Sequence, residues 1–334
     1  MLHIPVVGIT MGDPAGIGPE IVCRSLNEEQ VYTSCRPVVI GSREPLQQAL
    51  DVLGLQMRIR EITDPSEGGY DPGTINLFHI DLDYVVRPGI LCADNGRVAI
   101  AYMQKAYDLL TAGKIDAIAS APCHKGAMKM AGSPYAGATE LFAHFAGDKR
   151  TSTVVRQGSC YIFQLTTHLP LVQAIKTLTV DYISDFLIST VETMRLFGYS
   201  APKVALSAFN PHAGDNGALG TEEADILIPA IQKAEKVVGH IDGPIPADAI
   251  FLKGYDGTYD ALIPLFHDTA NIAIKLMDNI YPSVVITTGL PFIRTTVAHG
   301  TAYDIAYQGI AGHKKMLNCI LAAAEISGGM HKEV

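Results

Sequence analysis

TMGDPAGIGPE, residues 10–20, stands between an apolar run at residues 4–9 (IPVVGI) and the segment IVCRSL at residues 21–26. We predict a strand before it and a helix after it. A glycine-rich turn between a strand and a helix often holds a phosphate. This turn is not GxGxxG, however, and its aspartate and two prolines are unusual for a phosphate loop. What the loop holds is therefore the first question that the sequence raises.

The composition narrows the classes of protein. The chain has 334 residues, of which 48% are hydrophobic, enough for a large core and two lobes. Its net charge of −9 argues against non-specific binding to nucleic acid. No apolar run approaches the ~20 residues of a membrane span, and we expect no secretion signal. The six cysteines form no CxxC pair, so we expect reduced thiols in the cytoplasm and no cysteine zinc site.

Short apolar runs alternate with helical patterns along most of the chain. We predict strands at residues 37–40 and 115–119, and helices at residues 44–53 and 95–112. Such alternation predicts an α/β fold with a mostly parallel or mixed sheet and helices on its faces. Ligands of such sheets bind beyond the carboxyl ends of the strands. The residues that follow each strand are therefore the candidate site residues.

Three predicted strands are followed closely by a histidine. They are His168 after residues 161–167, His212 after residues 204–209, and His267 after residues 261–266. A single histidine at a strand end is more often a hydrogen-bonded structural residue, but three neutral imidazoles suit a divalent metal. The long spacing leaves both interpretations open.

A second distinctive stretch is HGTAYDIAYQG at residues 299–309, where we predict that Thr301 caps a helix. Together with GDPAGIGPE (12–20) it resembles the isocitrate and isopropylmalate dehydrogenase superfamily. The resemblance implies two α/β lobes with a cleft between them, and a late loop around the adenosine of a dinucleotide. A carboxylate at Asp304 can accept a hydrogen bond from a ribose hydroxyl and repels a 2′-phosphate, so we expect NAD rather than NADP.

Within that superfamily the chain resembles the 4-hydroxythreonine-4-phosphate dehydrogenase family. The segments that carry the resemblance are APCHKGAM (121–128), GATE (137–140), THLPL (167–171), NPHAGDNG (210–217), GPIPAD (243–248), HD (267–268) with IK (274–275), and GLPFIRT (289–295). The resemblance implies NAD-dependent oxidation of a phosphorylated hydroxy acid, followed by β-decarboxylation, in pyridoxine biosynthesis or sugar-acid breakdown. It also implies a homodimer with a shared active site.

The resemblance assigns roles to residues as well. One divalent metal, zinc first and magnesium, cobalt or manganese as alternatives, is held by three histidines, two from one subunit and one from the other; they match His168, His212 and His267. Substrate contacts match Thr139, Lys275 and Arg294. The residues expected at the dinucleotide are Gly12, Asp13, Gly16, Gly18, His299, Gly300, Thr301 and Asp304. Asp248 and Asp268 are candidates to deprotonate or orient the substrate, with Lys275 beside them, or else the two aspartates hydrogen-bond the metal histidines.

The chain departs from the family pattern in its substrate pocket. Ala138 stands where the family has a histidine, Val285 where it has an asparagine, and residues 269–270 read TA instead of QG. Two lost polar side chains would leave groups of an unchanged substrate unpaired, at about 1–3 kcal/mol each. We therefore expect the chemistry to be kept and the substrate pocket to be altered. The candidate substrates are 4-hydroxythreonine 4-phosphate, 4-phospho-D-threonate and 4-phospho-D-erythronate. The retained Arg294 and Lys275 favour these phosphorylated compounds over the cis-dihydrodiols that other relatives oxidise.

Two other functions stay open at this stage. Acyl or phosphoryl transfer is possible in a related fold, that of the phosphotransacetylases, although the late loop argues against it. Ala138 and Val285 also fit a metal-binding paralogue without catalysis. For the lobes, we predict residues 1–130 with 291–334 as the first, carrying much of the dinucleotide site. Residues 131–290 form the second, with the metal site and the dimer interface.

Overall fold

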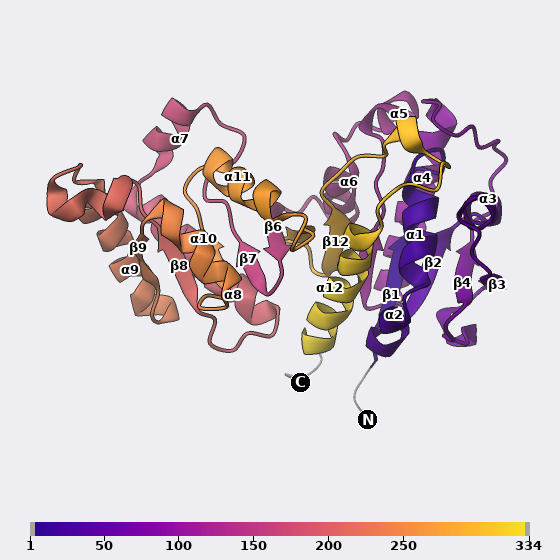
Figure 1. Cartoon of the computed structure of the whole chain (residues 1–334), viewed down its shortest axis with the longest axis horizontal. Coiled ribbons are helices and arrows are strands. Elements are labelled where there is room, and N and C mark those ends of the chain that lie inside the picture. The colour runs from indigo at the N-terminus through magenta and orange to yellow at the C-terminus, as the bar shows by residue number, and fades with distance from the viewer. Residues whose placement is uncertain (1–3, 331–334) are drawn as a thin grey trace. The chain divides into compact units, whose positions relative to one another are not determined.

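A computed structural model describes residues 4–330, and the chain divides into two compact units (Figure 1). Unit 1 comprises Met1–Ser152 and Val284–Val334, and unit 2 comprises Thr153–Ser283. Strands and helices alternate in both units, which confirms the predicted α/β class.

The sheet of unit 1 has the strand order β3-β4-β2-β1-β5-β12-β11. All neighbouring pairs are parallel except β11 and β12. The strands are β1 (Val6–Thr10), β2 (Arg36–Gly41), β3 (Arg58–Ile62), β4 (Thr74–His79), β5 (Ala117–Ser120), β11 (Val284–Thr288) and β12 (Ile293–Val297). The chain leaves β1 toward β2 on one side and returns through β5 on the other. The crevice between β1 and β5 is therefore the topological switch point where such sheets bind ligands.

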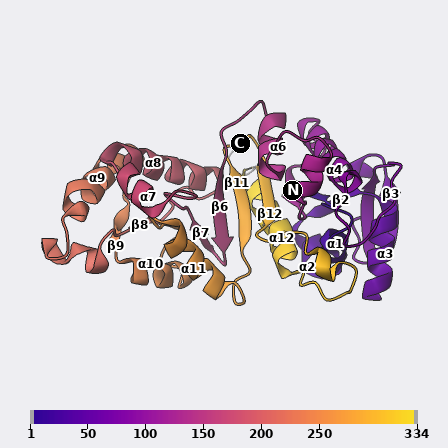
Figure 2. The ribbon, with the colours of Figure 1, turned by 90° about the horizontal axis from the view of Figure 1, so that it is seen from above.

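Helices cover both faces of this sheet, which explains why β1 and β5 read as continuous apolar runs rather than alternating ones. Figure 2 shows α4 and α6 on one side of the strands and α1 and α12 on the other. The helices of unit 1 are α1 (Gly18–Leu26), α2 (Glu29–Ser34), α3 (Arg43–Leu53), α4 (Ala93–Thr111), α5 (Lys125–Met130), α6 (Ala138–Phe145) and α12 (Lys314–Met330).

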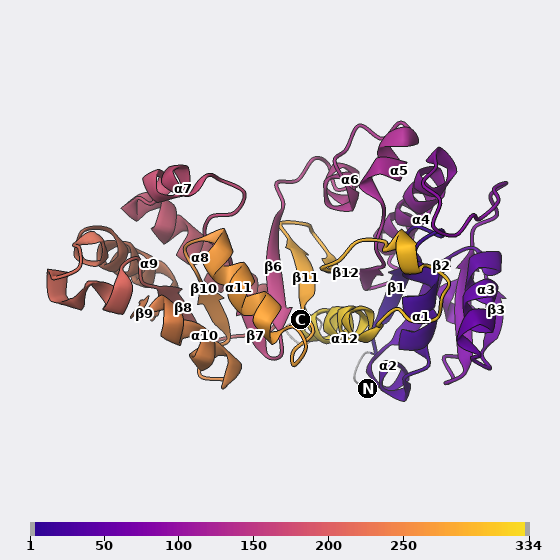
Figure 3. The same cartoon turned by 45° about the horizontal axis from the view of Figure 1, so that its top comes forward.

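Unit 2 has the strand order β6-β7-β10-β8-β9, with β6 antiparallel to β7 and the other pairs parallel. The strands are β6 (Ser152–Gln157), β7 (Cys160–Ile162), β8 (Val204–Ser207), β9 (Asp242–Ile245) and β10 (Ala261–Ile263). The helices are α7 (Leu171–Thr177), α8 (Val180–Leu196), α9 (Ile228–Val238), α10 (Ala247–Tyr255) and α11 (His267–Met277). Figure 3 shows α10 and α11 in front of strands β8 and β10. Side chains of these helices and strands, such as Ile250, Leu262 and Ile274, form one buried core.

The strands that precede the three histidines end earlier than we predicted. β10 stops at Ile263 because Pro264 has no N–H for the ladder, and its partner β7 stops at Ile162. His168 therefore lies in a loop and not directly at a strand end. The predicted helix after Thr301 is also wrong, since only the 3₁₀ turn Tyr303–Ile305 forms there.

Within residues 4–330, no helix is both long and apolar enough to cross a membrane. All six cysteines are free thiols.

Candidate active site

The early loop, residues 12–20, connects β1 to α1 at the switch point and is buried throughout. Gly12 has a φ of +75°, and a Cβ on it would lie 2.5 Å from the carbonyl oxygen of Pro122, in the segment that follows β5. A Cβ on Gly18 would lie 2.3 Å from the carbonyl oxygen of Met11. These two glycines are required because the chain packs against itself at this point.

The late loop, residues 299–309, closes over the early loop. Glu20 accepts hydrogen bonds from two of its backbone amides, Tyr307 N at 2.6 Å and Gly309 N at 2.7 Å. The Tyr307 hydroxyl donates to the carbonyl oxygen of Pro14 at 2.7 Å. Since Glu20 takes up amides that a helix would need, the predicted helix does not form. We call this assembly of the two loops the clasp; in Figure 1 its late part is the yellow segment that runs over α1.

Thr301 joins the two loops through its backbone. Its carbonyl oxygen accepts from Ile17 N at 2.9 Å, and a Cβ on Gly16 would lie 2.7 Å from the same oxygen. Gly16 is therefore the point of closest approach between the loops.

Asp13 is buried inside the clasp and is fully hydrogen-bonded. Its Oδ1 accepts from Ala15 N at 3.0 Å and its Oδ2 from the Tyr303 hydroxyl at 2.5 Å. Burial raises the pKa of Asp13 above its ordinary value, and the two donors only partly oppose this effect. The Tyr303 ring also stacks on the imidazole of His124, with ring centroids 5.0 Å apart.

The dinucleotide residues predicted from the sequence thus divide into two groups. Five are buried in the clasp: Gly12, Asp13, Gly16, Gly18 and Thr301. The other three, His299, Gly300 and Asp304, are half-buried or exposed, and a Cβ on Gly300 would meet open space.

Two buried hydroxyls at the switch point have no hydrogen-bond partner. Thr10 Oγ1 and Ser120 Oγ end the neighbouring strands β1 and β5, where the two residues pair in register. Unpaired buried hydroxyls are rare, and they mark a place where water or ligand groups are needed.

Arg294 is a buried cation on β12, 2% exposed. Its Nη1 donates to Thr287 Oγ1 at 2.8 Å and to Thr139 Oγ1 at 3.2 Å, while its Nε has no partner. The guanidinium lies over the ring of Phe142, 4.9 Å from its centroid. Burial lowers the pKa of Arg294 to about 10. Among the described residues no carboxylate forms an ion pair with it.

Ala138 and Val285, the two apolar residues that we predicted in the substrate pocket, lie close to this arginine in the fold. Ala138 begins α6 directly before Thr139. Val285 is two residues from Thr287 on β11, and Thr287 pairs with Arg294 across the sheet. Since side chains two residues apart share a face, Val285 lies on the face that carries Arg294.

Unit 2 brings together two of the three predicted histidines. The rings of His168 and His267 have centroids 5.4 Å apart and are tilted by 53°. His267 Nδ1 lies 3.1 Å from Asp268 Oδ1, an arrangement that leaves Nε2 of the ring for another partner. His168 is exposed in the loop between β7 and α7.

His212 lies in a strained segment, the 3₁₀ turn Pro211–Gly217. Residues 212–216 all have positive φ, from 42° to 79°, and only Gly214 among them is a glycine. Left-handed backbone costs about 1–2 kcal/mol per non-glycine residue. Strain of this kind persists where the surroundings enforce it, and it is concentrated at functional sites.

Glu223 holds the start of that segment in place. Its Oε1 accepts from Phe209 N at 2.9 Å and Asn210 N at 2.6 Å, and its Oε2 from Asn210 Nδ2 at 2.8 Å. Burial alone would raise the pKa of Glu223, but these hydrogen bonds outweigh it and hold the pKa below its ordinary value. No sequence motif marks this carboxylate, which stands in a polar stretch, TEEAD, at the start of a π-helical turn.

No three His, Cys, Asp or Glu side chains within residues 4–330 are grouped closely enough to hold a metal ion. His168 and His267 lie together in this chain, and His212 is not grouped with them. The predicted acid–base residues Asp248 and Lys275 are exposed on α10 and α11. Sequence reasoning missed Tyr303, Thr287 and Glu223. Tyr303 contacts Asp13 across 290 positions, whereas Thr287 and Glu223 contact partners 7 and 13–14 positions away, a spacing that no helix or strand pattern marks.

Comparison with known proteins gives consistent results. Residues 33–323 match the family model described as "Pyridoxal phosphate biosynthetic protein PdxA". A protein of Halalkalibacterium halodurans named "Putative D-threonate 4-phosphate dehydrogenase" is 39% identical, over 96% of each chain. Solved structures of 4-hydroxythreonine-4-phosphate dehydrogenases from Klebsiella pneumoniae and Burkholderia phymatum are each 36% identical. They match 97% of this chain and 98% of theirs, with TM-scores of 0.85 and 0.83.

Proposed function

The chain belongs to the family of the pyridoxal phosphate biosynthetic protein PdxA, and from this membership we propose how its two units work as a dehydrogenase. It is an oxidoreductase that acts on a CH–OH group of a small 4-phosphorylated hydroxy acid. We propose D-threonate 4-phosphate as the substrate, since the relative at 39% identity carries that name. The cofactors we propose are NAD and one divalent metal, zinc first.

The observation that carries this proposal is the buried Arg294. Its guanidinium is held by two hydroxyls, and its Nε has no partner among the described residues. A guanidinium placed in this way can donate two parallel hydrogen bonds to a phosphate. Thr139 beside it supplies a further hydroxyl. Val285 and Ala138 make the neighbouring surface apolar, which favours a substrate with fewer polar groups at that point than the family pattern requires.

For the metal we propose His168 and His267 of one chain. When bound there, a divalent metal would lower the pKa of an alcohol that it contacts. The contact between Asp268 and His267 supports the orienting role for this aspartate over that of proton acceptor, because it fixes the tautomer of the ring.

The proton acceptor we propose is Asp248, which is exposed and accepts no hydrogen bond from the described residues. Asp248 would accept the proton of the alcohol, and a bound NAD would accept the hydride from the alcohol carbon, which would be oxidised to a ketone as NAD is reduced to NADH. Oxidation β to the carboxylate gives a β-keto acid, which then loses carbon dioxide. Lys275, in the last turn of α11, would neutralise substrate charge.

For the dinucleotide we propose that the late loop makes the direct contacts. His299, Gly300 and Asp304 are its accessible residues, and Asp304 would accept from a ribose hydroxyl of NAD. The buried early loop holds the late loop in place, because Glu20 and Asp13 accept hydrogen bonds from it. Unit 1 would thus carry the dinucleotide and unit 2 the metal, in a reducing compartment that suits six free thiols.

A homodimer is supported by the incomplete histidine group and by the surface beside it. Directly after His168 come four exposed apolar side chains, Leu169, Leu171, Val172 and Ile175, which are 40–65% exposed. An apolar patch next to ligands that one chain cannot complete suits a second copy of the chain. We propose that the partner supplies the third histidine, His212.

Subunit mixing tests this arrangement. His212→Ala and His267→Ala chains should each be inactive alone, but a mixed dimer regains one intact site out of two. Co-expression with random pairing should restore about a quarter of the wild-type rate. If all three histidines of a site came from one chain, the mixture would stay inactive.

The activity itself is tested by NADH absorbance at 340 nm. With NAD and zinc, the protein should reduce NAD in the presence of D-threonate 4-phosphate and release carbon dioxide. D-Erythronate 4-phosphate and 4-hydroxythreonine 4-phosphate are the competing substrates. The proposal fails if none of the three yields NADH, or if full turnover survives removal of the metal by a chelator.

A further inference from the structure

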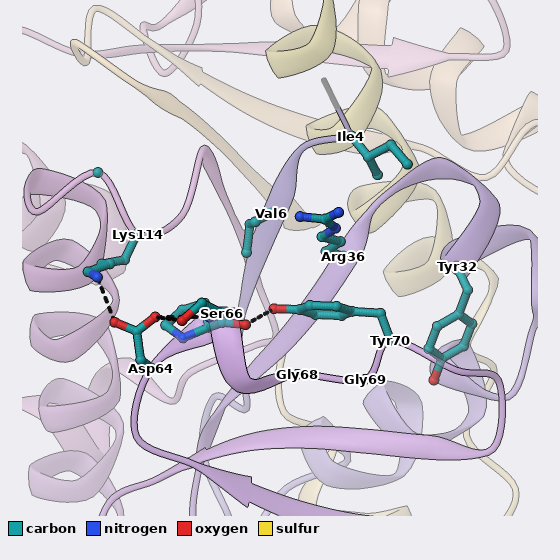
Figure 4. A pocket seen from close by; sticks show the side chains of 12 residues that line it. Ile4, Val6, Tyr32, Arg36, Asp64, Ser66, Gly68, Gly69, Tyr70 and Lys114 are labelled. Atoms are coloured by element: carbon teal, nitrogen blue, oxygen red, sulfur yellow. Dashed lines mark hydrogen bonds and ion pairs between the residues drawn. The ribbon is translucent and has the colours of Figure 1, made fainter. Parts of the chain in front are cut away.

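A pocket of about 600 Å³ opens in unit 1 at the amino-terminal ends of β1 and β2 (Figure 4). The early loop follows the carboxyl end of β1, five residues or about 16 Å away along the strand. No residue of the clasp lines the pocket, and neither does Arg294. The side chains that define it are Val6, Tyr32, Arg36, Asp64, Tyr70 and Lys114.

Three charged side chains line the pocket, and only one of its two cations forms an ion pair there. Lys114 Nζ lies 2.6 Å from Asp64 Oδ2, and this contact lowers the pKa of Asp64, so the two charges cancel. Arg36 is paired with no carboxylate among the described residues, and its guanidinium carbon lies 5.8 Å from the centroid of the Tyr70 ring. The pocket therefore has a net charge of one positive unit, located on Arg36.

The ring beneath Arg36 is held by a strained backbone. Tyr70 has a φ of +52°, which is rare for a bulky side chain. Its hydroxyl donates to the carbonyl oxygen of Pro65, and a Cβ on Gly68 would lie 2.6 Å from Tyr70 Cζ. Gly68 thus leaves room for the ring, which lies under the guanidinium of Arg36. Strain that positions a side chain in this way is typical of a binding site.

We propose that this pocket binds a small organic anion through a phosphate or carboxylate group that pairs with the guanidinium of Arg36. The guanidinium over the Tyr70 ring has a planar fork, which matches both groups bidentately. The volume lies in the range of small-molecule sites. The Lys114–Asp64 pair and Ser66 provide further polar contacts on the wall, and Ile4 and Val6 an apolar surface for the organic part.

Calorimetric titration of the full-length protein with phenyl phosphate, benzoate and phenol tests this site. The two anions distinguish phosphate from carboxylate, and phenol carries the same ring without the charge. The titrations use an Arg294→Met background, so that the arginine of the proposed substrate site cannot contribute. We expect one anion to bind and phenol not to bind.

Arg36→Gln should weaken that anion about tenfold or more, and Arg36→Lys should retain part of the affinity. Arg156→Gln is the matched control, because Arg156 also lies over a tyrosine, 5.5 Å from the centroid of Tyr161, but does not line the pocket. The proposal is overturned if neither anion binds, if Arg36→Gln binds as the parent does, or if phenol binds equally well. If Arg36→Lys bound the anion with the full affinity of the parent, bidentate pairing with the guanidinium would be excluded.

Discussion

The clasp of unit 1 and the histidine loops of unit 2 both follow strands of a mostly parallel sheet. Their polar side chains differ in burial and in hydrogen bonding. In the clasp, Glu20 and Asp13 are buried, and both oxygens of each carboxylate accept hydrogen bonds from the same chain. In unit 2, His168 is exposed, and the side chain of Asp268 is 92% exposed. The polar groups of the clasp are therefore paired within one chain, whereas those of the histidine loops lie exposed to solvent.

This difference predicts which property each region controls. Buried, paired groups contribute to the free energy of unfolding, because their loss leaves partners without hydrogen bonds. Exposed groups contribute little to stability, so they can be reserved for a ligand. Substitutions should thus separate into those that remove activity from a stable protein and those that also weaken the fold.

The largest effect should come from His267→Ala. Loss of a ligand should remove the bound metal and lower turnover by about a thousandfold or more, since a metal supplies several kcal/mol to the transition state. The metal-free protein should unfold at an unchanged temperature, because the His267 side chain is 38% exposed. Metal analysis, the rate at 340 nm and thermal unfolding measure the three quantities.

His240→Ala is the matched control for this substitution, as His240 is a more exposed histidine of unit 2 that is paired with Glu235. Metal content and turnover should both survive in that variant. A His267→Ala protein that kept its metal would show that His267 is not one of its ligands.

Arg294→Met should rank second and separate function from stability most clearly. Without the phosphate contact, kcat/KM should fall about 100- to 1,000-fold, or about 3–4 kcal/mol. The ligand-free protein should be as stable as the parent or more stable, because a buried cation without a carboxylate is unfavourable for folding. Arg43→Met, at an exposed ion pair with Glu61, is the control and should change neither quantity. Parallel losses of stability and activity would mean that Arg294 is structural.

Glu20→Gln should have the third effect, and here stability and function should change together. One amide of the late loop would face the NH₂ group of glutamine, which costs about 1–3 kcal/mol of unfolding free energy. A loosened late loop should also weaken NAD binding, measurable by titration. Glu44→Gln, an exposed carboxylate of α3, is the control. Unchanged NAD affinity in a destabilised Glu20→Gln protein would separate the clasp from the dinucleotide.

Part of this comparison could be read from the sequence. Alternating apolar runs predict the α/β units, and the glycine and histidine motifs mark the loops that the structure places at the clasp and in unit 2. The pairing of Asp13 with Tyr303 spans 290 residues and depends on tertiary packing, which local patterns do not encode. The early ends of β7 and β10 could also have been predicted, because Pro264 in the sequence interrupts the hydrogen bonding of β10. The fully buried Arg294 was also unexpected, because burial of a charge depends on what surrounds it.

The smallest effect should come from Glu223, the carboxylate that holds the strained His212 segment in place. Glu223 is buried and paired like a clasp residue, but it supports a histidine loop. Because its pKa in the folded protein lies below the ordinary 4.5, its ionised form stabilises the fold above that pH, and the stabilisation is lost as the pH falls through the lower, folded value. Glu223→Gln should cost about 1–2 kcal/mol near neutral pH, and its difference from wild type should shrink below pH 4.5.

Denaturant unfolding from pH 7 to pH 3 measures this difference. Glu222→Gln is the control, since Glu222 is more exposed and the backbone amides of Phe209 and Asn210 donate to Glu223 instead of to it; its difference from wild type should be smaller at every pH. A difference for Glu223→Gln that grows on acidification would mean that the carboxyl is neutral in the folded protein. The left-handed segment would then be held by Asn210 and the backbone, and His212 would owe its position to the turn instead of to a buried charge.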